Sequence, residues 1–512
     1  MVRTLKLILI FIFLVAGALV GHQALKAQAR TDVLRVAFPY SKSATEYEPA
    51  LIHLAPEYIF LENVFSPLVE LSPENGHVDP GVAESYKWDG LELHLVIRRS
   101  LKTVSGVPLT AADAAFSLKR LLTMPGNTHG DFRALLCGQT TLKTVSDDCD
   151  GIRVSGDELI LKTTPAGKTF LLPMLAAIDF AIIPRGSVNP ESLKITDFKN
   201  TSGPYYVSTD SKTGEIELQA NPNHYHYSHQ MPQVVRLVPT DKTNSLREFR
   251  DGHVDYITTI DAARADEIIE FARNNSDCTL HTTMNIRSFL LTFTRRGQTE
   301  IPPAQRFAIG KKIREALWTT LDGKDGYERS MQFFPTFGEG AVDQEKIAKI
   351  ADKFNVAASI PTAPIRMALV RLGNPQKFVD SIRAVLPQIE TYESVKNPNF
   401  IKFASSEEEP QLILSGPDTG FQEDIGLITY SLNAGYFGMS AEERKNWLNH
   451  YMDTPEKADR MNLLKSLHES VLSGPVIVPL LVAPYAAIAR KPWKVGLSQL
   501  YANNPLWLIQ TN

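Results

Sequence analysis

The sequence predicts an α/β fold in which mixed β-sheets are covered by helices, and three observations support this class. A chain of 512 residues is long enough for two or three domains with a large hydrophobic core. Apolar residues make up 43% of it and charged residues 21%, which is the balance of an ordinary globular protein. Segments with strand-like alternation and segments with helical periodicity follow one another along most of the chain, as they do in α/β proteins.

The N-terminal segment has the three-part layout of a secretory signal peptide. Arg3 and Lys6 precede an apolar run at 7–20, and Ala27-Gln28-Ala29 supplies the small residues of a cleavage site. The run is shorter than the ~20 residues that a membrane-spanning helix needs, and no Cys follows it that could carry a lipid. We therefore expect residues 1–29 to be removed on export; an uncleaved signal that anchors the protein is the alternative.

The charge of the chain argues against a nucleic-acid partner. The formal net charge is −4, and loss of Arg3, Lys6 and Lys26 with the signal peptide would make it −7 (−4 − 3). A mildly acidic chain without a basic block is not typical of proteins that bind DNA or RNA.

The chain has three cysteines, and export would permit disulfides. Cys137 and Cys149 lie close together in a polar stretch that contains glycine, so we predict that they pair. Two free thiols are the alternative, because connectivity cannot be deduced from sequence. Cys278 is the odd one, and we expect it to be buried and inert.

The first third of the chain contains short elements with clear boundaries. Strands are predicted at 33–38, from 66 and at 92–98, and a helix at 58–65. A second helix begins after Thr110, which is an N-cap residue with Asp113 three positions on as the acid of a capping box. This pattern assigns Asp113 a structural role and not a catalytic one.

The stretch Ser202–Ile257 is the one around which the fold is organised. Turn residues separate its alternating runs, so 205–207 and 215–220 are predicted to form a hairpin, followed by a strand at 234–239. A short helix at 245–250 ends before Gly252, which suits the C-cap region, and 254–257 is predicted as the next strand.

The second half again alternates strands with helices, which favours a mostly parallel, helix-covered sheet. The predicted strands are 288–293, 365–370, 411–415 and 475–481, and the predicted helices are 309–321, 374–386 and 463–472.

These motifs, in this order, resemble those of the extracellular solute-binding proteins of the dipeptide, oligopeptide and nickel type, the family 5 receptors of ABC importers. Residues 105–117 are similar to the family's D-G-x-P-L-T-A-x-D-V-x-F-S, and 202–257 to its G-P-Y, Asn-Pro-x-Tyr and Gly-x-Val-Asp series. Arg314-Glu315-Ala316-Leu317, with Asp322, matches R-x-A-L-x-x-x-x-D, whereas Thr294 stands near the position where the family usually has Asn. The resemblance covers about residues 33–500.

The resemblance implies a two-lobed periplasmic binding protein of type II with an extra small domain. The implied division is 1–29 signal peptide, 30–68 first part of lobe I, 69–184 small excursion domain, 185–283 second part of lobe I, 284–478 lobe II, and 479–512 C-terminal part of lobe I.

The resemblance also implies where a ligand would bind. The strand 412–414 runs into a loop in which Asp418 stands where the family's peptide receptors pair an Asp with the ligand's ammonium group. Thr419 and Phe421 follow in the same loop, and Phe421 could pack on a ligand side chain. His53-Leu54-Ala55 falls where these receptors run a piece of chain along the ligand. A turn or capping role for Asp418 and a surface loop at 53–55 are the alternatives.

Three histidines in one loop, His224, His226 and His229, suggest a metal site, because imidazoles two apart can share an ion. Against this, the family's corresponding loop lies on the outer surface, and no carboxylate or cysteine completes the set nearby. No cofactor is expected. No nucleophile elbow, P-loop, G-x-G-x-x-G, H-E-x-x-H or C-x-x-C motif is present, so nothing in the sequence supports an enzyme.

We therefore expect a periplasmic, monomeric receptor that captures a peptide or similar small solute and hands it to the permease of an ABC importer. The alternatives are a nickel or metal-chelate receptor, and an exported hydrolase or non-transporting sensor on the same scaffold.

Overall fold

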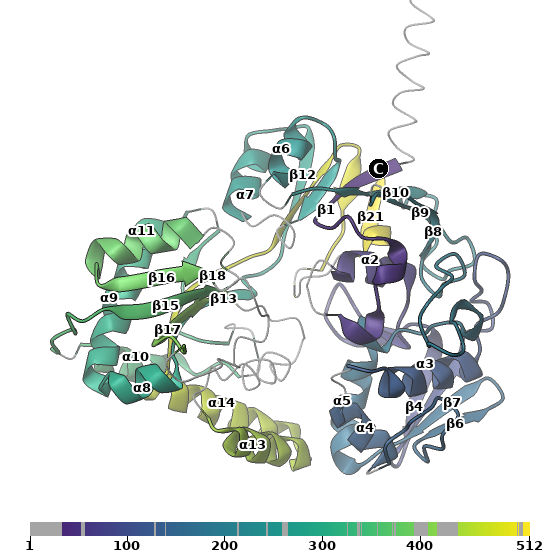
Figure 1. Ribbon diagram of the computed structural model, residues 1–512, viewed down its shortest axis with the longest axis horizontal. Coiled ribbons are helices and arrows are strands. Elements are labelled where there is room, and N and C mark those ends of the chain that lie inside the picture. The colour runs from purple at the N-terminus through teal and green to yellow at the C-terminus, as the bar shows by residue number, and fades with distance from the viewer. Residues whose placement is uncertain are drawn as a thin grey trace, which may run out of the picture.

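The computed structural model of the protein describes residues 33–511 apart from 53–56, 127–129, 139, 212–213, 242–243, 259–264, 325, 335–337, 339, 356, 371, 373–374, 394–407, 417–438, 499 and 501–504. The predicted signal peptide lies outside the described residues. Within them, no helix combines the length and the apolar character that crossing a bilayer requires. Figure 1 shows two bodies joined by a few crossing segments, and the right-hand body itself consists of two parts.

The first lobe is built around a seven-stranded mixed sheet. In sheet order its strands are β12 (Cys278–Thr282), β19 (Ala486–Arg490), β11 (Tyr256–Thr258), β1 (Val33–Phe38), β10 (Val234–Pro239), β9 (Ile216–Ala220) and β8 (Tyr205–Asp210). β1 lies parallel to β10 and β11, and the other neighbours are antiparallel. The predicted hairpin is confirmed, because β8 and β9 pair directly.

Helices and short strands complete the first lobe. They are α2 (Glu57–Val64), α6 (Ser245–Arg250), α7 (Ala265–Arg273), and the pair β20 (Trp493–Val495) and β21 (Ile509–Thr511). The pair β2 (Val69–Leu71) and β3 (Val78–Pro80) packs instead on the core of the small domain. Gly252, just past α6, has a φ of 80°, as expected of the glycine that follows a helix end.

The small domain is an antiparallel four-stranded sheet packed on helices. In sheet order its strands are β4 (Ala83–Asp89), β5 (Glu92–Ile97), β7 (Glu158–Lys162) and β6 (Ile152–Ser155); its helices are α3 (Ala111–Thr123), α4 (Gly130–Cys137) and α5 (Pro165–Leu175). A disulfide joins Cys137 to Cys149, with a Cα–Cα distance of 5.0 Å.

The second lobe contains a six-stranded sheet with helices on both faces. In sheet order its strands are β14 (Glu328–Arg329), β18 (Ile477–Ala483), β13 (Arg287–Phe293), β17 (Leu412–Ser415), β15 (Ile365–Val370) and β16 (Ile389–Glu393). Its helices are α8 (Arg295–Glu300), α9 (Pro303–Leu321), α10 (Gln344–Lys353), α11 (Pro375–Val385), α13 (Ala441–Asp453) and α14 (Lys457–Ser473).

The expectation of a mostly parallel sheet in the second lobe is wrong. Parallel pairing is confined to β15 with β16 and β17, whereas β13 pairs antiparallel with β17 and β18, and β14 pairs antiparallel with β18. The reason is topological: the chain enters this lobe through β13 and leaves it through β18, so the two strands run in opposite directions. β18 continues to Ala483 within the sheet, beyond the predicted boundary at 478, so the return crossing lies at 484–485.

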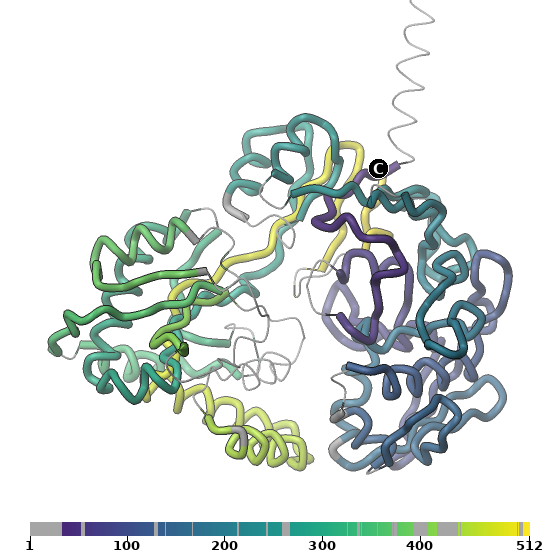
Figure 2. Tube along the Cα trace, in the orientation of Figure 1, coloured from purple at the N-terminus to yellow at the C-terminus, as the bar shows by residue number. Residues whose placement is uncertain are grey.

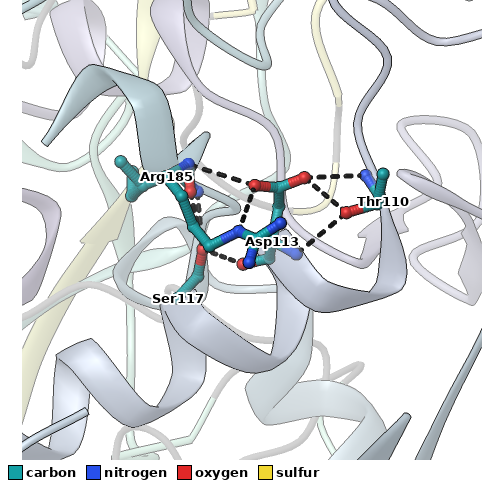
Figure 3. A network of polar contacts seen from close by, with 5 residues as sticks. Thr110, Asp113, Ser117 and Arg185 are labelled. Atoms are coloured by element: carbon teal, nitrogen blue, oxygen red, sulfur yellow. Dashed lines mark hydrogen bonds and ion pairs between the residues drawn. The ribbon is translucent and has the colours of Figure 1, made fainter. Parts of the chain in front are cut away.

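The capping motif at the start of α3 is structural, as the sequence predicts. The Thr110 side chain accepts a hydrogen bond from the Asp113 backbone N–H (3.2 Å), and the Asp113 carboxylate accepts one from the Thr110 N–H (3.0 Å). The same carboxylate accepts from the Arg185 backbone N–H and Nε, each at 3.1 Å, and the Ser117 hydroxyl accepts from the Ile183 N–H at 2.8 Å (Figure 3). The motif therefore fastens α3 to the segment by which the chain leaves the small domain.

The Gly-Pro-Tyr motif contains a glycine that nothing larger can replace. A Cβ at Gly203 would lie 2.4 Å from the backbone carbon of Val64 and 2.6 Å from the nitrogen of Phe65. Since both are main-chain atoms, Gly203→Ala is expected to destabilise the first lobe by about 3 kcal/mol, as measured by urea unfolding. Gly186→Ala is the control, because a Cβ there meets nothing within 4 Å, and equal stability of the two variants would contradict the argument.

Candidate functional site

All six predicted ligand-contacting positions lie outside the described residues. They are His53, Leu54, Ala55, Asp418, Thr419 and Phe421. The structure does describe the elements that precede and follow the two segments 53–55 and 418–421, and these elements define where each segment begins.

Both sheets direct the carboxyl ends of their parallel strands toward the crossing between the lobes. In the first lobe, β1 and β11 run parallel to β12, whose end is where the chain crosses to the second lobe. In the second lobe, β17 runs parallel to β18, whose end is where the chain returns. The chain leading to 53–55 follows β1, and the loop with Asp418 follows β17. The loop with Asp418 therefore follows a strand that ends at the sheet edge facing the crossing, where open α/β sheets bind ligands, whereas two 3-10 helices lie between β1 and 53–55.

The crossing consists of two connectors that are bonded to each other. Residues 283–286 link β12 to β13, and 484–485 link β18 to β19; in Figure 2 the teal and yellow tubes run side by side between the bodies. The Thr283 N–H donates to the Tyr485 carbonyl (3.0 Å), and the Tyr485 N–H donates to the Thr283 hydroxyl (2.8 Å). Two short connectors that lie together provide the geometry of a hinge.

A cation lies at the second-lobe end of this hinge. The Arg287 guanidinium lies 4.4 Å from the centre of the Tyr485 ring and donates to its hydroxyl at 2.5 Å. No local sequence pattern marks either residue, because 198 positions separate the two.

The end of β17 is buried and polar. Ser415 is 1% exposed, its hydroxyl has no hydrogen-bond partner among the described residues, and the N–H of Gly416 donates to the Val370 carbonyl at the end of β15 (3.2 Å). This bond fixes the last described residue before the Asp418 loop to the neighbouring parallel strand. The start of the loop is thus set by the sheet.

The approach to 53–55 is held by a buried ion pair. Glu48 caps the short 3-10 helix Pro49–Leu51 through the Ala50 N–H (3.1 Å), and its carboxylate accepts from Arg120 of α3 at 2.9 and 2.5 Å. The Arg120 side chain is only 2% exposed. The sequence gives no sign of this pair, because its members lie on different domains and neither belongs to a short motif.

A second charged pair borders the same segment. Glu57, the first residue of α2, lies 3.7 Å from the Lys42 Nζ, which also lies 5.1 Å from the centre of the Tyr40 ring. The Lys42 Nζ also lies 5.8 Å from the centre of the Tyr47 ring, and burial raises the pKa of the Tyr47 hydroxyl, so this ring stays neutral.

The three loop histidines do not converge on one point. His224 Nε2 lies 3.0 Å from the Ser66 hydroxyl, His226 Nε2 lies 2.7 Å from Glu70, and His229 Nδ1 lies 3.4 Å from the Tyr227 hydroxyl. No group of three or more potential metal-binding side chains occurs in the part of the chain that the structure describes.

The expectation that this loop lies on the outer surface is wrong for His224, which is 4% exposed. The loop packs between the first lobe and β2, and the His226 ring stacks on Trp507 at 4.9 Å. Burial lowers the pKa of His224 well below its usual value, so the ring is neutral. Its Nδ1 accepts a hydrogen bond from the His226 N–H (3.1 Å), as a neutral ring can.

Comparison with solved structures shows the same fold in three bacterial binding proteins. The Escherichia coli murein tripeptide binding protein MppA has 15% identity and a TM-score of 0.69, over 94% of this chain and 98% of that one. NikA from Brucella suis in complex with Fe(III)-EDTA has 15% identity and a TM-score of 0.73, over 94% and 100%. A periplasmic oligopeptide-binding protein from Borrelia burgdorferi also has 15% identity, with a TM-score of 0.71 over 94% and 100%.

Comparison at the level of sequence gives one match. No curated protein sequence matches the chain. The family described as bacterial extracellular solute-binding proteins, family 5 Middle, matches residues 77–330, which include the α3 capping motif and the Gly-Pro-Tyr stretch. The chain therefore belongs to the family 5 extracellular solute-binding proteins, the substrate-binding components of ABC importers.

Proposed function

We propose that this solute-binding protein captures a peptide or similar small solute between its lobes and delivers it, unaltered, to an ABC permease. The observation that carries the proposal is the pair of sheets whose carboxyl edges both face the bonded connectors. The murein tripeptide and oligopeptide receptors among the similar structures favour a peptide. Export through the predicted signal peptide would place the protein in the periplasm, where it would act as a monomer.

Asp418 is the residue that we propose for the ligand's amino terminus. Asp418 stands two positions after Gly416, which is bonded to β15 at the carboxyl edge of the second-lobe sheet. An ammonium group there would form charge-assisted hydrogen bonds with it.

Asp418→Asn is expected to weaken the binding of tri-alanine by about 10- to 100-fold, because a hydrogen bond to a charged group contributes about 1.5–3 kcal/mol. Isothermal titration calorimetry gives the Kd. N-acetylated tri-alanine, which has no ammonium group, should bind the two proteins equally. Asp251→Asn, at an exposed carboxylate of the first lobe, should bind as the natural protein does. An unchanged Kd for tri-alanine in Asp418→Asn would remove Asp418 from the site.

A metal chelate is the second candidate ligand, because one similar structure holds Fe(III)-EDTA. Mass spectrometry of the small molecules that co-purify with the protein, followed by calorimetry with di- to pentapeptides and with nickel-histidine, separates the two. The main proposal would be supported if a peptide co-purifies with the protein and if only the peptides give a heat of binding. Cleaved peptide after prolonged incubation would instead support the hydrolase.

A further inference from the structure

Helix α5 of the small domain has two apolar faces that belong to different cores. Leu171 and Leu175, each 0% exposed, pack into the core of the small domain. Phe170 is 5% exposed and belongs instead to a cluster formed mainly by the second lobe, and Met174 packs against both. One short helix thus contacts both the small domain and the second lobe, whose residues lie far apart in the sequence.

The second lobe meets Phe170 with aromatic and cationic groups. The Tyr451 ring of α13 lies 5.8 Å from the Phe170 ring and stacks on Trp447 at 5.4 Å. The Arg460 guanidinium of α14 lies 5.9 Å from the Phe170 ring, and its Nη1 donates to the carbonyls of Thr454 (3.0 Å) and Pro455 (2.7 Å). The α13–α14 pair therefore presents a preformed surface to α5.

This contact lies at the far side of the molecule from the hinge. In Figure 1 the segments that cross between the bodies lie in the upper half, and α13 approaches α4 and α5 at the bottom. Rotation about a hinge displaces the most distant points furthest, so opening of the lobes must separate α5 from α13 or carry the small domain along. A buried aromatic contact at this place biases the equilibrium between the two states.

We propose that Phe170, Tyr451 and Arg460 form an interlobe clasp that closes when the lobes close and adds to the affinity for the captured solute. This inference rests on the proposed function for its role in binding, and the existence of the clasp can be tested without any ligand. Breaking the clasp shifts the ligand-free protein toward the open form, and the ligand must then supply the energy of closure.

Small-angle X-ray scattering of ligand-free protein, stripped in guanidinium and refolded, tests the clasp. Phe170→Asp places a charge in the contact, and it is expected to increase the radius of gyration while the melting temperature stays within about 2 °C. The melting temperature is expected to remain unchanged because Leu171 and Leu175 still pack α5 into the core of the small domain. Val154→Asp, at a 44% exposed site of the same domain, is the matched control and should change neither quantity.

An unchanged radius of gyration in a folded Phe170→Asp variant would overturn the proposal. Phe170→Ala is also measured, in case the Asp variant does not fold. A large drop in the melting temperature of Phe170→Ala would also overturn the proposal, because Phe170 would then be a core residue of the small domain. If tri-alanine binds the natural protein, Phe170→Ala should raise its Kd about tenfold or more. If tri-alanine does not bind, the peptide proposal fails while the scattering result still decides the clasp.

Discussion

Replacing Arg120 with Met is expected to destabilise the protein by about 3–5 kcal/mol, the cost of leaving one member of a buried ion pair without its partner. Arg120 donates to both carboxylate oxygens of Glu48, and its Nε donates to the Leu193 carbonyl at 2.7 Å. Removing the guanidinium leaves a carboxylate that is only 15% exposed and a part-buried carbonyl without their donor. Chemical unfolding monitored by circular dichroism measures the loss.

Three further variants separate this mechanism from a general loss of packing. Arg120→Lys keeps the charge but not the two-pronged geometry, so its stability should lie between those of the natural protein and Arg120→Met. The double variant Glu48→Leu/Arg120→Met removes both charges and should recover much of the loss. Arg99→Met breaks an ion pair whose side chains are 85% and 47% exposed, and it should cost less than about 1 kcal/mol. Equal losses in Arg99→Met and Arg120→Met would refute the argument.

The Arg120–Glu48 pair also bears on the binding site, since Glu48 holds the chain just before His53. If the segment 53–55 contacts the ligand, Arg120→Met should weaken binding even under conditions in which the protein remains folded. The Gly186→Ala protein, which has a substitution in the first lobe with no close neighbour, provides the comparison for this effect.

The parts of the fold that sequence predicted well are those with local causes. β1 begins and ends where the alternating run does, and α3 begins after Thr110 because the capping box involves residues only three positions apart. The hairpin of β8 and β9 is likewise a property of adjacent runs and the turn between them.

The parts that sequence missed depend on contacts between distant segments. The extent of β18 follows from its pairing with β13, nearly two hundred positions earlier, and the run 475–481 gives no sign that the strand continues to Ala483. The burial of His224 results from packing against Ser66, 158 positions away. The clasp at Phe170 likewise joins helices on different lobes, and an apolar residue on a helix does not reveal which core it enters. For the candidate site, the sequence predicts the two segments, and the topology adds that the strands preceding them, β1 and β17, both end at the edges facing the hinge.

Lowering the pH from 7.5 to 5 is expected to remove about 2 kcal/mol of stability through His468 alone. This residue of α14 is 0% exposed, and both of its ring nitrogens take part in hydrogen bonds. The Phe333 N–H can only donate, so Nε2 accepts its bond (2.8 Å), and Nδ1 therefore carries the proton that it donates to the Gly340 carbonyl (2.9 Å). A second proton on Nε2 would face the Phe333 N–H, which cannot accept it, and burial lowers the pKa of the ring to about 4 from the ordinary 6.5.

The direction of the effect follows from which state takes up the proton first. The folded pKa is depressed, so the unfolded chain binds the proton below about pH 6.5 while the folded ring stays neutral, and stability falls until the pH reaches about 4. Urea unfolding of the natural protein and of His468→Gln at both pH values isolates the contribution, because Gln does not titrate. The stability gap between them should shrink by about 2 kcal/mol at pH 5, whereas His77→Gln, at an exposed ring, should leave the pH dependence unchanged. If the difference in stability between the two proteins is the same at both pH values, His468 is protonated in the folded protein at pH 5. That result would contradict the hydrogen bond that the Phe333 N–H donates to Nε2.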